Sequence, residues 1–175
     1  MKNTLVISAF PCCGKTYFTN NHKDWGIDID VADSDSSKFS WIETDKGRVR
    51  NTNFINDYME HITSLAGKVD IIFVSSHKDV REALWERNIP HVIICPVMDA
   101  KEEWTKRMVS RGNSPEFIEF ITSNWESFIS EINMTSCSVD DKTPRLLCHL
   151  SKHGHIGSKM YEYLLKPLTD FMPYK

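Results

Sequence analysis

The sequence predicts an α/β fold: a single domain built on a five-stranded parallel sheet with helices on both faces. Short apolar runs typical of strands alternate with segments whose apolar residues recur at helical spacing. Such alternation is typical of parallel strands joined by right-handed helical crossovers. The chain has 175 residues, enough for one domain of ordinary size, and no repeat or low-complexity linker divides it. We therefore expect one domain over residues 1–175.

Five segments have the composition of strands. They lie at residues 5–8, 26–32, 69–74, 91–95 and 145–150. The run at 69–74 is the most continuously apolar, as expected for a parallel strand that is covered on both faces. Pro96 follows the fourth segment directly and is expected to end that strand.

Helical patterns separate these strands. Helices are expected at about 15–21, over about 16 residues from near Asn53, and at about 78–87, 99–111, 116–132 and from 157 onward. Ligands of doubly wound sheets bind beyond the carboxyl ends of the strands. Four loops are therefore candidate site segments: 9–16, 33–41, 75–81 and 151–157.

Composition excludes several classes of protein. The formal net charge is −3, so no global basic field favours nucleic acid or an anionic membrane surface. No apolar run approaches the ~18 residues of a membrane span, and the start of the chain shows no signal-peptide pattern. The five cysteines have neither a disulfide framework nor zinc-knuckle spacing. We expect a cytoplasmic protein without a membrane or nucleic-acid partner, and a homodimer is left open.

A phosphate-binding motif follows the first predicted strand. The stretch Ala9-Phe10-Pro11-Cys12-Cys13-Gly14-Lys15-Thr16 ends as the G-x-x-x-x-G-K-[ST] loop does. In such loops, backbone N–H groups surround phosphate oxygens at the start of a helix. Its first position is Ala9 rather than glycine, so the chain there is expected to keep an ordinary conformation. The expected nucleotide-binding residues of this loop are Ala9, Cys12, Cys13, Gly14, Lys15 and Thr16.

The last two residues of the motif have defined chemical roles. Lys15 is expected to reach the β- and γ-phosphates of ATP and to act in catalysis by neutralising the charge that develops there. The Thr16 hydroxyl is expected to take one coordination position of Mg²⁺. ATP and Mg²⁺ are therefore the expected cofactors.

Two carboxylates follow the second predicted strand. Asp33 and Asp35 lie two residues apart, so their side chains point the same way if strand geometry continues. Near a triphosphate, such carboxylates bind Mg²⁺ or orient an acceptor hydroxyl. We assign Asp33 to the metal and Asp35 to the acceptor and to catalysis. The alternative is a helix cap or Asx turn, because Asp and Ser crowd this stretch.

Three arginines are candidates for binding phosphate. Arg81 lies one turn beyond His77 and is expected to face the acceptor. Arg107 and Arg111 are also one turn apart, before the break Gly112–Pro115, which suits catalytic residues of a helical lid over about 107–133. The alternatives are a solvated Arg81 and helix-end arginines that only complement the macrodipole.

An aromatic pair follows the acidic stretch. Phe39 and Trp41 are candidates for stacking on a base, with Trp41 assigned to the acceptor. The alternative is that both belong to the core.

These residues together resemble the small P-loop kinases: nucleoside monophosphate kinases such as adenylate kinase, with shikimate and gluconate kinases as relatives. The tract Asp33-Ser34-Asp35 resembles the D-x-D of shikimate kinase, where one acid serves Mg²⁺ and the other the acceptor hydroxyl. The pair Arg107 and Arg111 resembles the lid arginines of adenylate kinase, one over adenine and one on phosphate. Residues 151–155 fall where that family wraps a loop around adenine, which implies a cofactor contact by His153.

Two tracts also resemble proteins described as nucleotide kinases in phages and prophages of low-GC Gram-positive bacteria. They are Asp33–Trp41 and Arg111-Gly112-Asn113 before an aromatic-rich helix. This resemblance implies a phage protein that acts in the host cytoplasm. The chain lacks the D-G-[FY]-P-R motif of adenylate kinase.

The sequence thus predicts an ATP-dependent, Mg²⁺-requiring phosphotransferase. The expected acceptor is a (deoxy)nucleoside monophosphate, whose own phosphate attacks without a general base. One alternative is a kinase of a small hydroxyl-bearing metabolite, with Asp35 assisting the hydroxyl. Another is a nucleotide-binding regulatory module with little turnover, because Ser75 and Ser76 stand where many P-loop proteins place a metal-binding acid.

Overall fold

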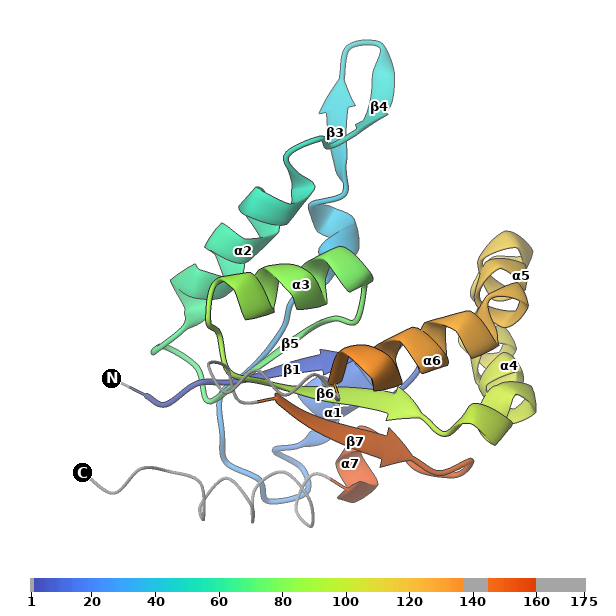
Figure 1. Ribbon diagram of the computed structural model, residues 1–175. Helices are drawn as coiled ribbons and strands as arrows, with labels where there is room; N and C mark the ends of the chain where they lie inside the picture. The colour runs from blue at the N-terminus through green and yellow to red at the C-terminus, as the bar shows by residue number, and fades with distance from the viewer. Residues whose placement is uncertain (1, 137–144, 160–175) are drawn as a thin grey trace.

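Five parallel strands form the central sheet of the protein (Figure 1). The computed structural model describes residues 2–136 and 145–159. β1 (Leu5–Ala9) lies between β5 (Ile71–Ser75) and β6 (His91–Pro96), while β2 (Val31–Asp33) and β7 (Arg145–Leu150) are the edge strands. The strand order is β2-β5-β1-β6-β7, and every pairing is parallel. The predicted five-stranded parallel sheet is confirmed.

Helices cover both faces of this sheet (Figure 1). Because successive strand residues point to opposite faces, the core divides into two clusters. On one face, α2 (Phe54–Leu65) and α3 (Lys78–Glu86) pack on a cluster that includes Val6, Ile72 and Val74. On the other face, Phe18 of α1 (Lys15–Asn21) joins a cluster that includes Ile7, Ile71 and Phe73. α7 (Ile156–Lys159) packs next to α1.

Three further helices follow β6. The short 3₁₀ turn Met98–Ala100 leads into α4 (Lys101–Ser110), which is followed by α5 (Pro115–Ser123) and α6 (Trp125–Ser136). The single helix predicted over 116–132 is wrong, because Asn124 leaves helical geometry and its amide donates a hydrogen bond to Phe120 O at 2.8 Å. Trp125 then donates its indole N–H to Met98 O at 2.7 Å, which fixes the start of α6.

The second predicted strand is shorter than its sequence pattern. Only Val31–Asp33 pairs with β5, whereas the pattern extends back to residue 26. Ile27 and Ile29 do pack against the core, which explains the alternation. Their backbone N–H groups donate locally, to His22 O and Ile27 O, so they add nothing to the sheet ladder.

A two-stranded antiparallel ribbon stands outside the main sheet. After the 3₁₀ turn Ser36–Lys38, β3 (Trp41–Thr44) pairs with β4 (Gly47–Arg50). The ribbon projects away from the body of the protein (Figure 1). The sequence predicted a loop up to residue 41 and no strand pairing beyond it. All eight strand residues are exposed, so the pattern of burial on which strand prediction depends is absent.

Two expectations from composition can be compared with the described residues. None of the helices in the described part is long and apolar enough to cross a membrane. The four cysteines within residues 2–136 and 145–159 are free thiols, and Cys137 lies outside the described residues. The part of the closing helix expected beyond residue 159 also lies outside them.

A buried tyrosine joins the carboxyl ends of β2 and β5. The Tyr58 hydroxyl donates to Ser34 O at 2.7 Å and accepts from the backbone N–H of Ser75 at 3.2 Å. Burial raises the pKa of Tyr58 to about 12, so the hydroxyl keeps its proton and remains a donor at neutral pH. These two bonds hold the end of the edge strand beside its neighbour.

Replacement of Tyr58 by phenylalanine tests this junction. The change leaves two buried backbone groups without that partner, so the free energy of unfolding should fall by about 1–3 kcal/mol. Urea denaturation measures the loss as a lower midpoint concentration with an unchanged m-value. Tyr17→Phe is the matched control, because the Tyr17 side chain is 62% exposed, and its effect should stay within about 0.5 kcal/mol. Equal stability of the two variants would contradict the structural role of the Tyr58 hydroxyl.

Candidate functional site

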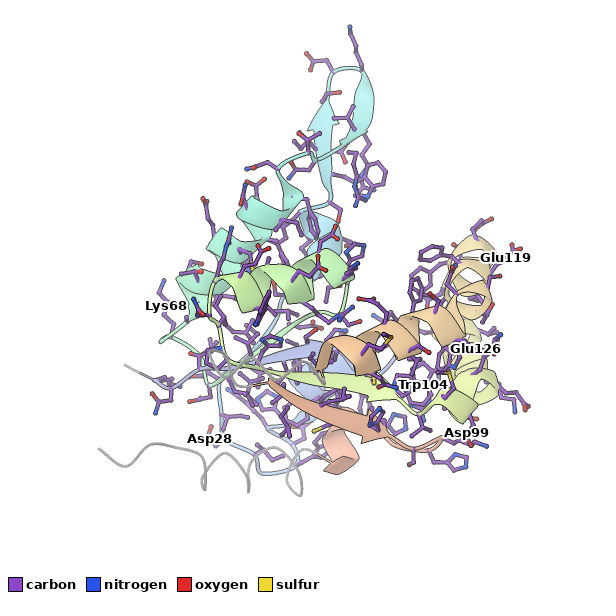
Figure 2. The ribbon with its side chains drawn as sticks, in the orientation of Figure 1. Asp28, Lys68, Asp99, Trp104, Glu119 and Glu126 are labelled. Carbon is purple, nitrogen blue, oxygen red and sulfur yellow. The ribbon has the colours of Figure 1, made fainter. Side chains whose placement is uncertain are left out.

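The loop after β1 is held by three separate parts of the chain. The backbone N–H of Phe10 donates to Ile94 O of β6 at 2.9 Å. Trp104 lies on α4, where Figure 2 labels it, and its indole N–H donates to Pro11 O at 3.0 Å. Ile156, at the start of α7, donates its backbone N–H to Cys13 O at 3.0 Å. The loop therefore has a fixed shape at the carboxyl edge of the central strand.

Two residues of the loop have left-handed backbone conformations. Gly14 has φ 100°, which glycine adopts without strain. Cys12 has φ 62°, and a residue with a side chain pays about 1–2 kcal/mol for this conformation. Ala9 is part of β1, so the ordinary conformation expected there is confirmed. The strained position of the loop is thus Cys12, whose Sγ lies 3.9 Å from Asn113 Oδ1.

Lys15, the lysine of the motif, reaches back across the loop. Its Nζ donates to Ala9 O at 3.0 Å, across the loop. Burial lowers the pKa of the Lys15 ammonium, while the nearby Cys13 and Asp33 act to raise it. The positive charge of Arg111 also lowers the pKa of Lys15, so these two cations lie within electrostatic reach of each other. The sequence expected both residues at the same phosphate chain.

Thr16 and Asp33, the two expected metal ligands, are in direct contact. The Thr16 hydroxyl donates to Asp33 Oδ2 at 2.7 Å, which leaves the lone pairs of Oγ1 available to a ligand. A hydroxyl and a carboxylate oxygen are the donor types that Mg²⁺ takes. The described residues hold no cluster of three or more His, Cys, Asp or Glu side chains suited to a metal. This pair therefore fits Mg²⁺ that takes its other ligands from phosphate and water, as Mg²⁺ does in kinase sites.

Asp35 is engaged as a cap in this structure. Its Oδ1 accepts the backbone N–H of Ser37 at 2.9 Å, at the start of the 3₁₀ turn Ser36–Lys38. The capping alternative left open by the sequence is therefore present. Its proposed part in acceptor binding and catalysis stays a prediction.

Arg107 brings α4 and the loop before α7 together. Its guanidinium donates to Lys152 O at 2.7 Å and to Gly154 O at 2.8 Å, and lies 4.0 Å from the centre of the Trp104 ring. The loop expected to surround adenine is thus joined directly to one of the two arginines that were expected to lie over adenine and on phosphate. His153 is exposed on this loop. Partial burial and the charge of Arg107 lower the pKa of the neighbouring His155, which favours its neutral form.

Arg81 occupies a different environment from the one expected. Its side chain is only 4% exposed, and it forms an ion pair with Glu131 of α6 at 2.8 Å. Its Nε donates to Ser76 O at 3.0 Å. These contacts join α3, the end of β5 and α6. Contact of Arg81 with an acceptor stays a prediction.

Some residues at the site were not selected from the sequence. Asn113 and Glu131 were passed over, as was Tyr58, and the indole of Trp104 was not assigned to the loop. The break at Gly112–Pro115 contains Asn113, but a single sequence does not show that this side chain reaches Cys12. The same holds for Glu131, because its helical pattern shows only that it lies off the apolar stripe.

Comparison with known proteins finds no matching family model and no matching curated protein. The fold is a five-stranded all-parallel α/β domain with the strand order β2-β5-β1-β6-β7. This fold is compatible with that of P-loop nucleoside triphosphatases.

The two arginines at the end of α4, Arg107 and Arg111, should differ in a hydrogen-exchange experiment. Arg107→Ala removes two hydrogen bonds from a charged donor to the 151–157 loop, so amide exchange there should accelerate by about 10-fold or more. Arg111→Ala is the control, because Arg111 is exposed on the same helix end. Mass spectrometry of the protein without nucleotide measures both. Equal acceleration in the two variants would show that Arg107 does not hold the loop.

Proposed function

We propose that this protein is an ATP-dependent phosphotransferase of the P-loop kinase type, acting on a nucleoside monophosphate. The observation that carries the proposal is the hydrogen bond from Thr16 Oγ1 to Asp33 Oδ2 at 2.7 Å. Thr16 directly follows Lys15 in the chain. A phosphate loop alone indicates nucleotide binding. A loop lysine next to a hydroxyl–carboxylate pair adds the parts that phosphoryl transfer needs.

The residues of the chain divide the work by charge. ATP with Mg²⁺ supplies the transferable phosphoryl group and neutralises part of its negative charge. Lys15 supplies a cation from the loop, and Thr16 offers an oxygen whose proton is directed to Asp33. The charge of Arg111 lowers the pKa of Lys15, and in the proposal Arg111 adds positive charge where negative charge develops. No covalent intermediate with the protein is needed.

Nucleotide orientation is assigned to the other lid arginine. Arg107 stacks on Trp104 and fixes Lys152 and Gly154 through their carbonyl groups. This arrangement supports a base-binding role for the loop at 151–155, with His153 exposed on it. In the proposal, Arg107 contributes to catalysis by holding the nucleotide in position.

A second candidate function is a kinase of a small hydroxyl-bearing metabolite. It is favoured by one observation, the ion pair between Arg81 and Glu131 in an environment where Arg81 is 4% exposed. A monophosphate acceptor brings about two negative charges and needs a cation to meet them, and Arg81 was the expected one. A neutral acceptor needs no such cation, and Asp35 would then orient its hydroxyl.

Turnover on a panel of acceptors tests the proposal. ADP formation from ATP and Mg²⁺ should appear with a nucleoside or deoxynucleoside monophosphate, and Lys15→Ala should lower the rate by roughly 100-fold or more. Lys23→Ala, at an exposed lysine shortly after α1, is the matched control. Parental turnover in Lys15→Ala would refute the site. Saturable ATP binding without ADP formation on any acceptor would instead favour the regulatory module.

Two further variants separate the kinase hypotheses. For a monophosphate acceptor, Arg81→Ala should raise the acceptor KM, and Asp35→Asn should impair the reaction mainly through its Mg²⁺ dependence. For a hydroxyl acceptor, Asp35→Asn should lower kcat at saturating Mg²⁺. Glu131→Gln is the control, because it weakens the same ion pair without removing the guanidinium. If Glu131→Gln raised KM as much as Arg81→Ala, the effect would be structural and would not support direct contact.

A further inference from the structure

The β3–β4 ribbon carries an aromatic and basic face. The sequence assigned its Trp41 to the acceptor base, and that contact stays a prediction. The residues proposed for phosphoryl transfer itself, Lys15, Thr16 and Arg111, lie outside the ribbon.

Trp41 pairs across the ribbon with Arg50, and Glu43 pairs with Arg48, so these four side chains share one face. The guanidinium groups of Arg48 and Arg50 each lie 5.6 Å from the centre of the Trp41 ring. Trp41 is still 42% exposed, so part of its ring remains open to a ligand.

The root of the ribbon is fixed to the body of the protein. The buried Asn51 donates its backbone N–H to Ser40 O at 3.0 Å, and its amide donates to Phe39 O and to Asp57 Oδ2, both at 2.8 Å. These bonds tie both ends of the ribbon to α2. Arg50 also lies 5.9 Å from the centre of the Phe54 ring, at the start of α2. The face is thus presented by an anchored element.

Charge is distributed unevenly between the ribbon and the rest of the chain. Residues 38–50 contain four basic and two acidic side chains, a net charge of +2, in a chain whose formal net charge is −3. Glu43 forms an ion pair with Arg48 at 3.3 Å, but both side chains are more than half exposed. Such a pair contributes little, so a phosphate can replace the carboxylate at small cost. The expectation of no nucleic-acid partner rested on the net charge of the whole chain, which does not show that the ribbon is locally basic.

We propose that the Trp41–Arg48–Arg50 face of the ribbon binds single-stranded nucleic acid. An aromatic ring offers a stacking surface to any base, and neighbouring arginines bind the phosphates between bases. The surface is open and projects from the body (Figure 1). Small ligands gain affinity by being enclosed in a pocket, which an exposed ribbon does not provide. A polymer instead gains it from several contacts in a row, and for this reason we favour an oligonucleotide over a free nucleotide.

Fluorescence anisotropy with a labelled oligothymidylate of about 15 nucleotides, without ATP, tests the proposal. Trp41→Ala should weaken binding by roughly 5- to 150-fold, the effect of losing one base stack. Trp41→Phe keeps a ring and should restore much of the affinity. The double variant Arg48→Ala/Arg50→Ala should make the negative slope of log K against log salt shallower by about 1.4, because each phosphate contact to a single strand contributes about −0.7 to that slope.

Controls on the ribbon and on the body separate recognition from folding. Ile42→Thr changes the opposite face, where Ile42 and Val49 form a cross-strand pair, and should leave binding unchanged. Arg87→Ala removes an arginine near α3 that binds Asn56 and should also leave binding unchanged. Thermal unfolding by circular dichroism should be the same for all ribbon variants, since the exchanged side chains are exposed.

Three outcomes would overturn the proposal. The first is absence of binding to the oligonucleotide at about 50 mM salt, where phosphate contacts are strong. The second is wild-type affinity in Trp41→Ala. The third is displacement of the oligonucleotide by thymidine monophosphate at an equal nucleotide concentration, which would make the face a subsite for a free nucleotide. None of these measurements depends on phosphotransferase activity, so failure of the proposed function would leave this test intact.

Discussion

The central strand of the sheet sets the position of the loop that follows it, residues 10–14. β1 pairs with β5 on one side and with β6 on the other, so its backbone groups are occupied by two neighbours in register. The chain must therefore leave the sheet where β1 ends, and the loop with the predicted phosphate-binding motif lies at that edge. The ends of β5 and β6 lie beside it, and the loop takes its first anchor from Ile94 O. Site geometry here is a consequence of strand pairing.

Polar contacts at the edge of the sheet then place the charged groups. β2 has one strand partner, and the Tyr58 hydroxyl supplements it at Ser34 O, one residue beyond Asp33. Asp33 is thereby held where the Thr16 hydroxyl can donate to it. On the opposite side of the loop, Arg107 and Trp104 connect α4 with the loop and with residues 152–154. Side chains from distant segments thus support the few groups that carry charge.

The sequence allowed the five-stranded parallel sheet to be predicted because its strands give local signals, while the phosphate-binding role of the loop after β1 stays a prediction. Apolar runs mark strands that are buried on both faces, and Gly14, Lys15 and Thr16 form a motif at fixed spacing. The β3–β4 ribbon was missed because its strands bury nothing, and burial is what produces a readable pattern. The environment of Arg81 was missed for another reason. Its partner Glu131 is 50 residues away, and a single sequence does not reveal such pairs.

The hydrogen bond from Ile156 N–H to Cys13 O makes the loop after β1 depend on a segment more than 140 residues later in the chain, which affects the order of folding. The loop after β1 is synthesised before β5, β6 and α7, which begin at residues 71, 91 and 156. Until β5 or β6 has been made, the apolar β1 has no parallel partner. Until Ile156 has been made, the carbonyl group of Cys13 lacks this donor. Contacts between residues far apart in the sequence form slowly, because the chain loses the entropy of closing a long loop before the contact contributes any stability. We therefore expect the loop after β1 to reach its final shape only after these later segments have been made.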